Sequence, residues 1–164
     1  MKKVKKGKVV ILCGGKGTRI REETEFRPKP MVEIGHKPLL WHIMKIFSSY
    51  GINDFIICCG YKGYVIKEYF ANYLLHNSNV TVDLANDKIE LQRSDAEPWR
   101  VSLVDTGDES GTGGRLLRIR DYLPDEAFYM TYGDGVANVD VHELAAVHKA
   151  QGKFATLTAV QPPG

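Results

Sequence analysis

Two runs of this sequence, Lys8–Cys13 and Phe55–Cys59, are apolar at nearly every position, and each ends at a glycine. A strand with one face in water alternates apolar and polar residues, so a continuous apolar run is typical of a strand buried on both faces. Helical spacing of apolar residues follows each run, from Pro38 to Gly51 and over residues 65–74. Strands that alternate with helices predict an α/β fold, here a Rossmann-like, mainly parallel sheet with helices on both faces.

The rest of the chain continues this pattern with one insertion. Apolar and polar residues alternate over Val80–Leu84 and Ile89–Gln92, with Asn86-Asp87 between them, which predicts a β-hairpin near residues 80–92. The further elements that we expect are strands at 101–104, 127–131 and 154–160, and helices at 115–123, opened by Gly113-Gly114, and at 141–151.

The expected organisation is a basic leader over residues 1–7 and one domain over residues 8–164. The chain stops at Pro162-Pro163-Gly164, directly after the last expected strand. Nothing in the pattern closes the domain there, so we expect the domain to be truncated at its C-terminus.

Charge and apolar patterning exclude several classes of partner. There are 22 Lys and Arg against 20 Asp and Glu, a net charge of +2, which is too balanced for a nucleic-acid-binding protein. No apolar run is long enough to span a membrane, and no apolar segment follows the basic start as in a secretory signal. The three cysteines form no CxxC pair, which indicates a reducing, cytoplasmic location and argues against a zinc site.

Three features follow strands or lie in loops where an α/β sheet binds ligands, outside the carboxyl ends of its strands. The first is Gly14-Gly-Lys-Gly-Thr-Arg19, directly after the first apolar run. Its glycines let the backbone approach a ligand and turn amides toward phosphate oxygens, while Arg19 offers a forked donor. The spacing matches neither a P-loop nor the dinucleotide fingerprint, and a plain tight turn with a surface arginine stays open.

The second feature is Lys29, which lies between Pro28 and Pro30. The prolines restrict the backbone and pre-position an ammonium that suits a phosphate, although a solvated loop lysine is the alternative. The third is Asp134 between Gly133 and Gly135, after an apolar strand. This carboxylate is placed to hold Mg²⁺ against a triphosphate, and the alternative is an Asp-Gly turn.

A weaker candidate is the polar glycine-rich loop over residues 105–115, which precedes an expected helix. Amides at that helix start could hold an anion or the edge of a base, and the alternative is a simple N-cap and loop.

Together, GGxGTR after the first strand, PKP at residues 28–30 and GDG after a later strand resemble the sugar-phosphate nucleotidylyltransferase family. Longer stretches are similar to those members of the family that use CTP and α-D-glucose 1-phosphate. The likeness covers nearly the whole chain from Lys8 onward and implies a nucleotidyltransferase fold of the GT-A-like type. These stretches are residues 29–35, 41–44, 54–64, 97–99, 104–107, 112–115 and 131–135.

The resemblance implies transfer of a cytidylyl group from CTP to α-D-glucose 1-phosphate, which gives CDP-glucose and pyrophosphate for bacterial surface polysaccharide, including the lipopolysaccharide O-antigen. It implies a homo-oligomer for the full-length enzyme. It also implies three catalytic residues: Arg19 on the departing phosphates, Lys29 on phosphate oxygens, and Asp134 as the ligand of the cofactor Mg²⁺. The residues implied to bind the nucleotide are Leu12, Cys13, Gly14, Gly15, Lys16, Gly17, Thr18, Arg19, Lys29, Ser110, Arg115 and Gly133.

The sequence departs from the family pattern in two mild ways and one larger one. Cys13 stands where the family usually has alanine, and Ile20 where it usually has leucine. The family's later half supplies a second Mg²⁺ carboxylate, a lysine for the sugar phosphate and most sugar contacts, so we expect weak or absent turnover from this chain alone. Two other functions stay open: a transferase that uses UTP or dTTP, and a non-catalytic nucleotide-binding module.

Overall fold

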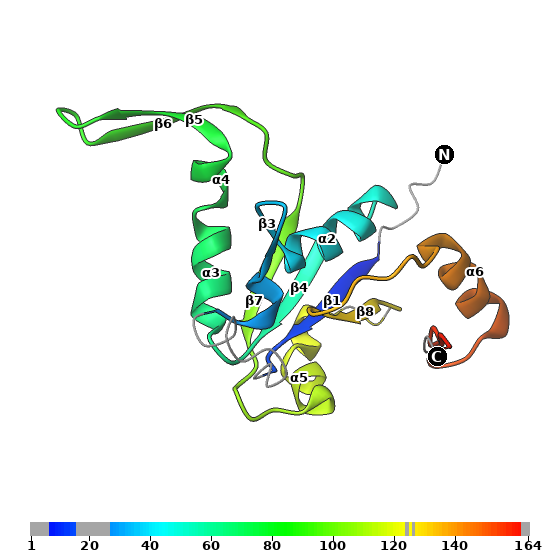
Figure 1. Cartoon of the computed structure of the whole chain (residues 1–164). Helices are drawn as coiled ribbons and strands as arrows, with labels where there is room; N and C mark the ends of the chain where they lie inside the picture. The colour runs from blue at the N-terminus through cyan, green and yellow to red at the C-terminus, as the bar shows by residue number, and fades with distance from the viewer. Residues whose placement is uncertain (1–6, 16–26, 124, 126, 162–164) are drawn as a thin grey trace.

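The computed structural model describes residues 7–15, 27–123, 125 and 127–161. At its centre is a four-stranded sheet in the order β7-β4-β1-β8, and every neighbouring pair is parallel (Figure 1). The strands are β1 (Lys8–Cys13), β4 (Asp54–Cys59), β7 (Arg100–Asp105) and β8 (Tyr129–Tyr132). The prediction of a mainly parallel α/β sheet is therefore confirmed.

The two apolar strands lie in the middle of the sheet because both of their faces are covered. Val9, Ile11 and Cys13 of β1 face one hydrophobic cluster, whereas Val10 and Leu12 face the other. The same division holds along β4, whose residues Phe55–Cys59 are all buried. Continuous apolar sequence was the signal for this double burial.

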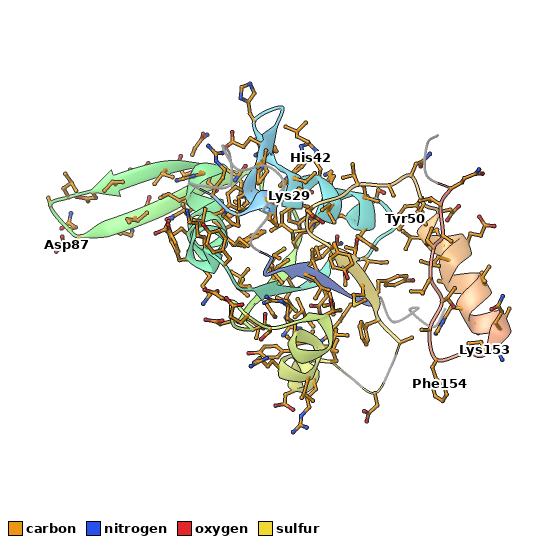
Figure 2. The ribbon with its side chains drawn as sticks, turned by 60° about the horizontal axis from the view of Figure 1, so that its bottom comes forward. Lys29, His42, Tyr50, Asp87, Lys153 and Phe154 are labelled. Carbon is orange, nitrogen blue, oxygen red and sulfur yellow. The ribbon has the colours of Figure 1, made fainter. Side chains whose placement is uncertain are left out.

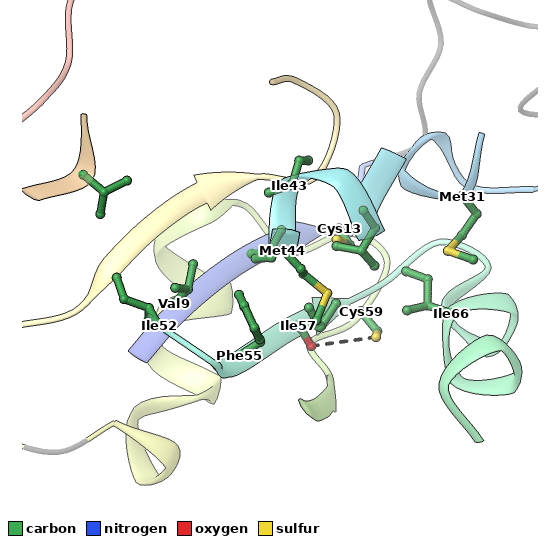
Figure 3. Packing of buried hydrophobic residues seen from close by; sticks show 13 residues of the cluster. Val9, Cys13, Met31, Ile43, Met44, Ile52, Phe55, Ile57, Cys59 and Ile66 are labelled. Carbon is green, nitrogen blue, oxygen red and sulfur yellow. Dashed lines mark hydrogen bonds between the residues drawn. The ribbon is translucent and has the colours of Figure 1, made fainter. Parts of the chain in front are cut away.

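Helices cover both faces of the sheet, as predicted. The larger cluster packs against α2 (Leu39–Ser49) and α3 (Gly63–Ala71), which contribute Ile43, Met44 and Ile66 (Figure 3). On the opposite face, Ile119 and Leu116 pack against Val10 and Ile56, next to α5 (Thr112–Arg118). The connection from α3 continues through α4 (Tyr73–His76) after a break at Asn72.

The predicted hairpin is present as a separate two-stranded sheet of β5 (Ser78–Asp83) and β6 (Lys88–Ser94). It projects from the end of α4 away from the central sheet, with Asp87 at its tip (Figures 1 and 2). Its turn covers residues 84–87, where the Asp83 carboxylate accepts hydrogen bonds from the Ala85 and Asn86 amides. These bonds explain why the polar tip reverses the chain.

Four short elements complete the described architecture. They are η1 (Lys29–Met31), the ribbon of β2 (Glu33–Ile34) and β3 (Lys37–Pro38), and η2 (Arg120–Tyr122). The last helix, α6 (Val141–Gln151), begins at Asp140, whose carboxylate accepts from the amides of His142 and Glu143. In the described ranges, no helix is long and apolar enough to cross a membrane.

One expected strand does not form in the described residues, and the bounds of two other expected elements are wrong. The predicted strand at 154–160 is irregular and exposed, and Phe154 points away from the rest of the molecule (Figure 2). Within the described residues it has no neighbouring strand, and an apolar pattern alone makes no strand without backbone partners. The helix predicted from Arg115 begins at Thr112 and ends at Arg118, so Gly113 and Gly114 lie inside it. The strand predicted at 127–131 occupies Tyr129–Tyr132.

Candidate functional site

A pocket of about 230 Å³ lies at the carboxyl edge of the sheet, where three predicted features meet. The sheet register explains the meeting, because Cys13, Cys59 and Asp105 are direct neighbours at the ends of β1, β4 and β7. Their following loops therefore start at the same level. The pocket is lined by Leu12, Cys13, Gly14, Gly15, Lys29, Pro30, Ser110, Gly111, Thr112, Arg115, Tyr132 and Asp134.

The charged centre of the pocket is an ion pair between Lys29 and Asp134, whose Nζ and Oδ2 atoms are 2.9 Å apart. The two residues are 105 positions apart in the sequence and come from η1 and from the loop after β8. Their side chains are 24% and 47% exposed, so solvent and ligands can reach both. A cation and an anion that pair here offer opposite charges to a phosphate and to a metal ion.

Gly133 brings the Asp134 loop against the end of β1. Its amide donates to the Leu12 carbonyl at 3.0 Å. A Cβ at this position would lie 2.5 Å from Cys13 Sγ and 3.0 Å from Pro30, a side chain next to Lys29. Any larger residue would push apart the segments that carry the two charges. Gly133 therefore lies behind the pocket and permits the close packing of its walls.

Burial raises the pKa of the Cys13 thiol well above its ordinary value. The thiol is consequently neutral at physiological pH and adds no negative charge beside a phosphate site. The sulfur that stands where the family usually has alanine acts here as an apolar packing group against Gly133.

The opposite wall comes from the loop before α5 and from its first turn. Ser110 Oγ accepts a hydrogen bond from Arg118 at 2.7 Å, and the Thr112 hydroxyl lies 3.5 Å from Tyr132 Oη. The first amides of a helix have no partner within the helix and can bind acceptors on a ligand. This wall thus presents hydroxyls and amides, whereas the wall around Lys29 and Asp134 presents charge.

Arg115 lines the pocket although it is only 5% exposed. It donates to the Gly14 carbonyl at 3.0 Å and to the Thr106 hydroxyl at 2.6 Å. It also donates to the Gly107, Asp108 and Cys59 carbonyls at 2.8, 3.3 and 3.4 Å. All five acceptors are uncharged, so none of these bonds neutralises the arginine.

The donor set includes one carboxylate that fits a divalent metal. Asp134 is accessible, and its Oδ2 already pairs with a cation. Elsewhere in the ranges that the structure describes, no three His, Cys, Asp or Glu side chains are grouped to hold a metal ion. Mg²⁺ usually takes one or two carboxylates and completes its shell with water and phosphate oxygens, so Asp134 suits a metal that arrives with a nucleotide.

Of the thirteen residues predicted to bind the nucleotide or the metal, the structure brings eight together in the pocket lining. They are Leu12, Cys13, Gly14, Gly15, Lys29, Ser110, Arg115 and Asp134. Gly133 packs directly behind them. Four predicted residues, Lys16, Gly17, Thr18 and Arg19, lie outside the described residues.

Four pocket residues were absent from the predicted set: Pro30, Gly111, Thr112 and Tyr132. Three of them are adjacent in sequence to a predicted residue, and Thr112 is two positions after Ser110. Gly111 and Thr112 also belong to the polar loop already singled out as a weaker candidate. Pro30 and Tyr132 have apolar surfaces that indicate core packing, and only the fold shows that they reach the pocket.

Comparison with known proteins shows the family to which the chain belongs. Residues 8–163 match the family model described as nucleotidyl transferase. The chain is 64% identical, over 96% of its length, to a glucose-1-phosphate cytidylyltransferase of Salmonella typhimurium. It is 46% identical, over 93% of its length, to a probable glucose-1-phosphate cytidylyltransferase of Bacillus subtilis. The chain spans 62% and 60% of the lengths of these two relatives.

Solved structures show the same fold at low sequence identity. HddC from Yersinia pseudotuberculosis, solved with GMP-PN, aligns with a TM-score of 0.63 at 24% identity, over 87% of this chain and 54% of that one. A UDP-glucose pyrophosphorylase solved with UDP-glucose also aligns with a TM-score of 0.63, at 19% identity over 89% and 54% of the two chains. With the family match over almost the whole sequence, these findings show that the chain belongs to the nucleotidyl transferase family.

Proposed function

We propose that this chain carries the nucleotide-binding part of an enzyme that transfers a cytidylyl group from CTP to α-D-glucose 1-phosphate. The products are CDP-glucose and pyrophosphate. The observation that carries the proposal is the Lys29–Asp134 pair in a pocket walled by the glycine bend after β1. The choice of CTP and glucose 1-phosphate is supported by the activity named for the relative that is 64% identical.

In this reaction, an oxygen of the sugar phosphate forms a bond to the α-phosphorus of CTP, and the bond from that phosphorus to the pyrophosphate oxygen breaks. Such a transfer needs little covalent help from the protein. It needs alignment of the two oxygens and compensation of the charge that grows on pyrophosphate.

The described residues can meet these needs in different ways. The Lys29 ammonium is a point charge for phosphate oxygens, and the backbone at Gly14 and Gly15 has no side chain to keep a ligand at a distance. Ser110 and the first turn of α5 supply hydrogen-bonding groups on the opposite wall. Arg19 lies outside the described residues. In this proposal it contacts the departing phosphates.

Asp134 would hold Mg²⁺, which when bound supplies positive charge to the phosphate oxygens. The carboxylate accepts from Lys29 in the structure. In this proposal, Asp134 binds the metal ion and Lys29 binds a phosphate. The contact between the two side chains is then replaced by one ligand contact for each. The second metal carboxylate and the sugar contacts belong, in this proposal, to sequence that follows this chain.

Calorimetric titration of the 164-residue chain with CTP, UTP, dTTP and GTP in the presence of Mg²⁺ tests the binding part of the proposal. We expect CTP to bind most tightly, and an equal or tighter affinity for UTP or dTTP would contradict the choice of base. Absence of binding to all four would contradict the nucleotide site itself.

A pyrophosphate-release assay tests the reaction. It uses CTP, Mg²⁺ and glucose 1-phosphate, with the present chain and with the same protein extended by its natural downstream sequence. We expect rapid release from the longer protein and slow or no release from the 164-residue chain. CTP binding without release by the longer protein would identify a non-catalytic nucleotide-binding module instead.

The same proposal places the enzyme in the cytoplasm as a homo-oligomer, on a route to deoxysugars of bacterial surface polysaccharide such as the O-antigen. Nucleotide triphosphates and sugar phosphates are both cytoplasmic metabolites, which supports this location.

A further inference from the structure

Arg115 is buried next to the pocket, and its hydrogen bonds reach three strand ends that are far apart in sequence. The Gly14 carbonyl follows β1, the Cys59 carbonyl ends β4, and the Thr106–Asp108 loop follows β7. The guanidinium thus connects the bend at Gly14 to two neighbouring strands at distances of 2.6–3.4 Å.

Two glycines, Gly14 and Gly60, lie directly against the Arg115 side chain. A Cβ on Gly14 would lie 2.0 Å from the guanidinium carbon of Arg115, and a Cβ on Gly60 would lie 2.7 Å from Nη1. Neither glycine has a positive φ, so backbone conformation is not the reason for a glycine at these positions. Gly14 leaves the space that the guanidinium fills, whereas Gly60 leaves room for both the guanidinium and the backbone of Gly14, whose Cα would lie 2.8 Å from a Cβ on Gly60.

Thr106 shows that the position of Arg115 is itself fixed. Its side chain is fully buried, and its hydroxyl donates to the Cys59 carbonyl at 2.7 Å while accepting from Arg115 at 2.6 Å. The Thr106 amide donates to the same carbonyl at 2.8 Å. A buried network in which each group has a partner holds one arrangement, because any displacement leaves polar groups unpaired.

From this geometry we infer that Arg115 is a positioning residue that fixes the bend at Gly14–Gly15 before any nucleotide binds. Four backbone carbonyls and one hydroxyl occupy its guanidinium in the ligand-free protein. A lysine could not replace it, because one ammonium cannot span acceptors on three strand ends. The importance of the bend for CTP rests on the proposed function, whereas the fixing of the bend does not.

The first test measures the bend alone, without nucleotide. Backbone ¹⁵N relaxation of the full 164-residue chain gives the order parameters of Gly14 and Gly15. We expect both to fall from about 0.85 to below about 0.6 in Arg115→Ala and Arg115→Lys, while those of β1 stay unchanged. Gly14→Ala, which keeps the arginine but displaces it, should have the same effect. Unchanged order parameters, or full rescue by lysine, would overturn the inference.

The second test measures CTP affinity by calorimetry at a temperature at which every variant is folded by circular dichroism. We expect Arg115→Ala and Arg115→Lys to weaken CTP at least tenfold. Arg100→Ala is the matched control, since it removes an arginine that pairs with Asp54 at the opposite end of the sheet, and should stay within twofold. Equal affinities for Arg115→Lys and the unchanged protein would also overturn the inference.

The two tests separate this inference from the proposed function. If the unchanged chain binds no CTP, the proposed function fails, and the order parameters still decide the role of Arg115. If Arg115→Ala does not fold, Arg115→Lys and Gly14→Ala provide the same comparison with smaller changes in volume and charge.

Discussion

At the scale of single residues, two charged side chains of the pocket, Lys29 and Asp134, form an ion pair with each other. Lys29 and Asp134 neutralise each other across a sequence separation of 105 residues, at the point where the proposed substrates bring a phosphate and a metal ion. The pair is partly open to water, so its contribution to folding is small. In the proposed function, the pair matters for binding rather than for stability.

Asp134→Asn separates these two contributions. Because the pair is partly exposed, we expect the free energy of unfolding to change by less than about 1 kcal/mol. CTP affinity in the presence of Mg²⁺ should fall at least about tenfold, since the asparagine cannot supply a charged metal ligand. Calorimetry and urea unfolding measure the two quantities. Asp54→Asn is the control, because Asp54 is also in an ion pair, 3.2 Å from Arg100, outside the pocket. A weaker effect of Asp134→Asn than of Asp54→Asn on affinity would contradict the site.

The three thiols give a second prediction at this scale. Burial raises the pKa of Cys58 and of Cys59 to about 11, and that of Cys13 also lies well above its ordinary value. We therefore expect iodoacetamide to label none of them in the folded chain at pH 8 and all three in urea, as counted by mass spectrometry. Fast labelling of one thiol at pH 8 would show that its strand edge opens.

The sign of the pH effect on stability follows from the same shifts. The folded thiols keep their protons above pH 9, while unfolded thiols lose theirs near the ordinary value of 9.0. Stability from this source is complete below pH 9 and is lost as the pH rises toward about 11. Urea unfolding between pH 8 and 11 should show this decrease, and a rise over that interval would contradict it.

At the scale of elements, the central sheet and the β5–β6 hairpin differ in how much they depend on packing. Ile57 of β4 is completely buried, whereas Ile89 of β6 is 63% exposed. The alternating pattern of the hairpin puts Val80 opposite Leu91 and Val82 opposite Ile89, so one of its faces is apolar. In the described part of the chain this face is open, and the strands have only each other as hydrogen-bonding partners.

A matched pair of substitutions measures this difference. Ile57→Ala removes the same atoms as Ile89→Ala, but it leaves a cavity between the sheet and its helices. We expect Ile57→Ala to lower the free energy of unfolding by about 2–5 kcal/mol and Ile89→Ala by less than about 0.5 kcal/mol. Urea unfolding gives both values. Similar losses for the two variants would mean that the hairpin is packed against something in solution.

The start of α6 is stabilised by a side-chain cap. Asp140 Oδ1 accepts from the amides of His142 and Glu143 at 2.8 and 3.0 Å. Asp140→Ala should destabilise the helix by about 0.5–2 kcal/mol, measured as faster hydrogen exchange along Val141–Gln151. Asp140→Asn keeps the acceptor and should retain most of the protection. Equal exchange in the alanine and asparagine variants would argue against the cap.

At the scale of the whole molecule, sequence and structure agree where one local pattern decides the outcome. Continuous apolar runs predicted β1 and β4, and apolar spacing predicted α6 with its observed ends. These predictions succeed because the pattern of burial of a strand or helix is visible in residues that are close in sequence. The glycine bend, Lys29 and Asp134 could be placed at one edge because parallel strands align their carboxyl ends.

The remainder depended on partners that are distant in sequence. Residues 154–160 carry an apolar pattern but have no strand beside them in the described residues. Their sequence alone therefore predicted a strand that the structure does not contain. Arg115 was expected to contact the nucleotide, and only the fold shows that its donors meet the Gly14 carbonyl and the Thr106 hydroxyl. No local spacing encodes the contact with Gly14, because the two residues are 101 positions apart.

The link between Gly14 and Arg115 also sets an order of events during synthesis of the chain. The ribosome completes the first strand and the bend long before it adds the arginine that holds the bend. Until the residues up to Arg115 have emerged and α5 has docked on the sheet, the early segment has its final sequence but not its final shape. The lining of the pocket is complete later still, because Tyr132 and Asp134 follow Arg115 in the chain.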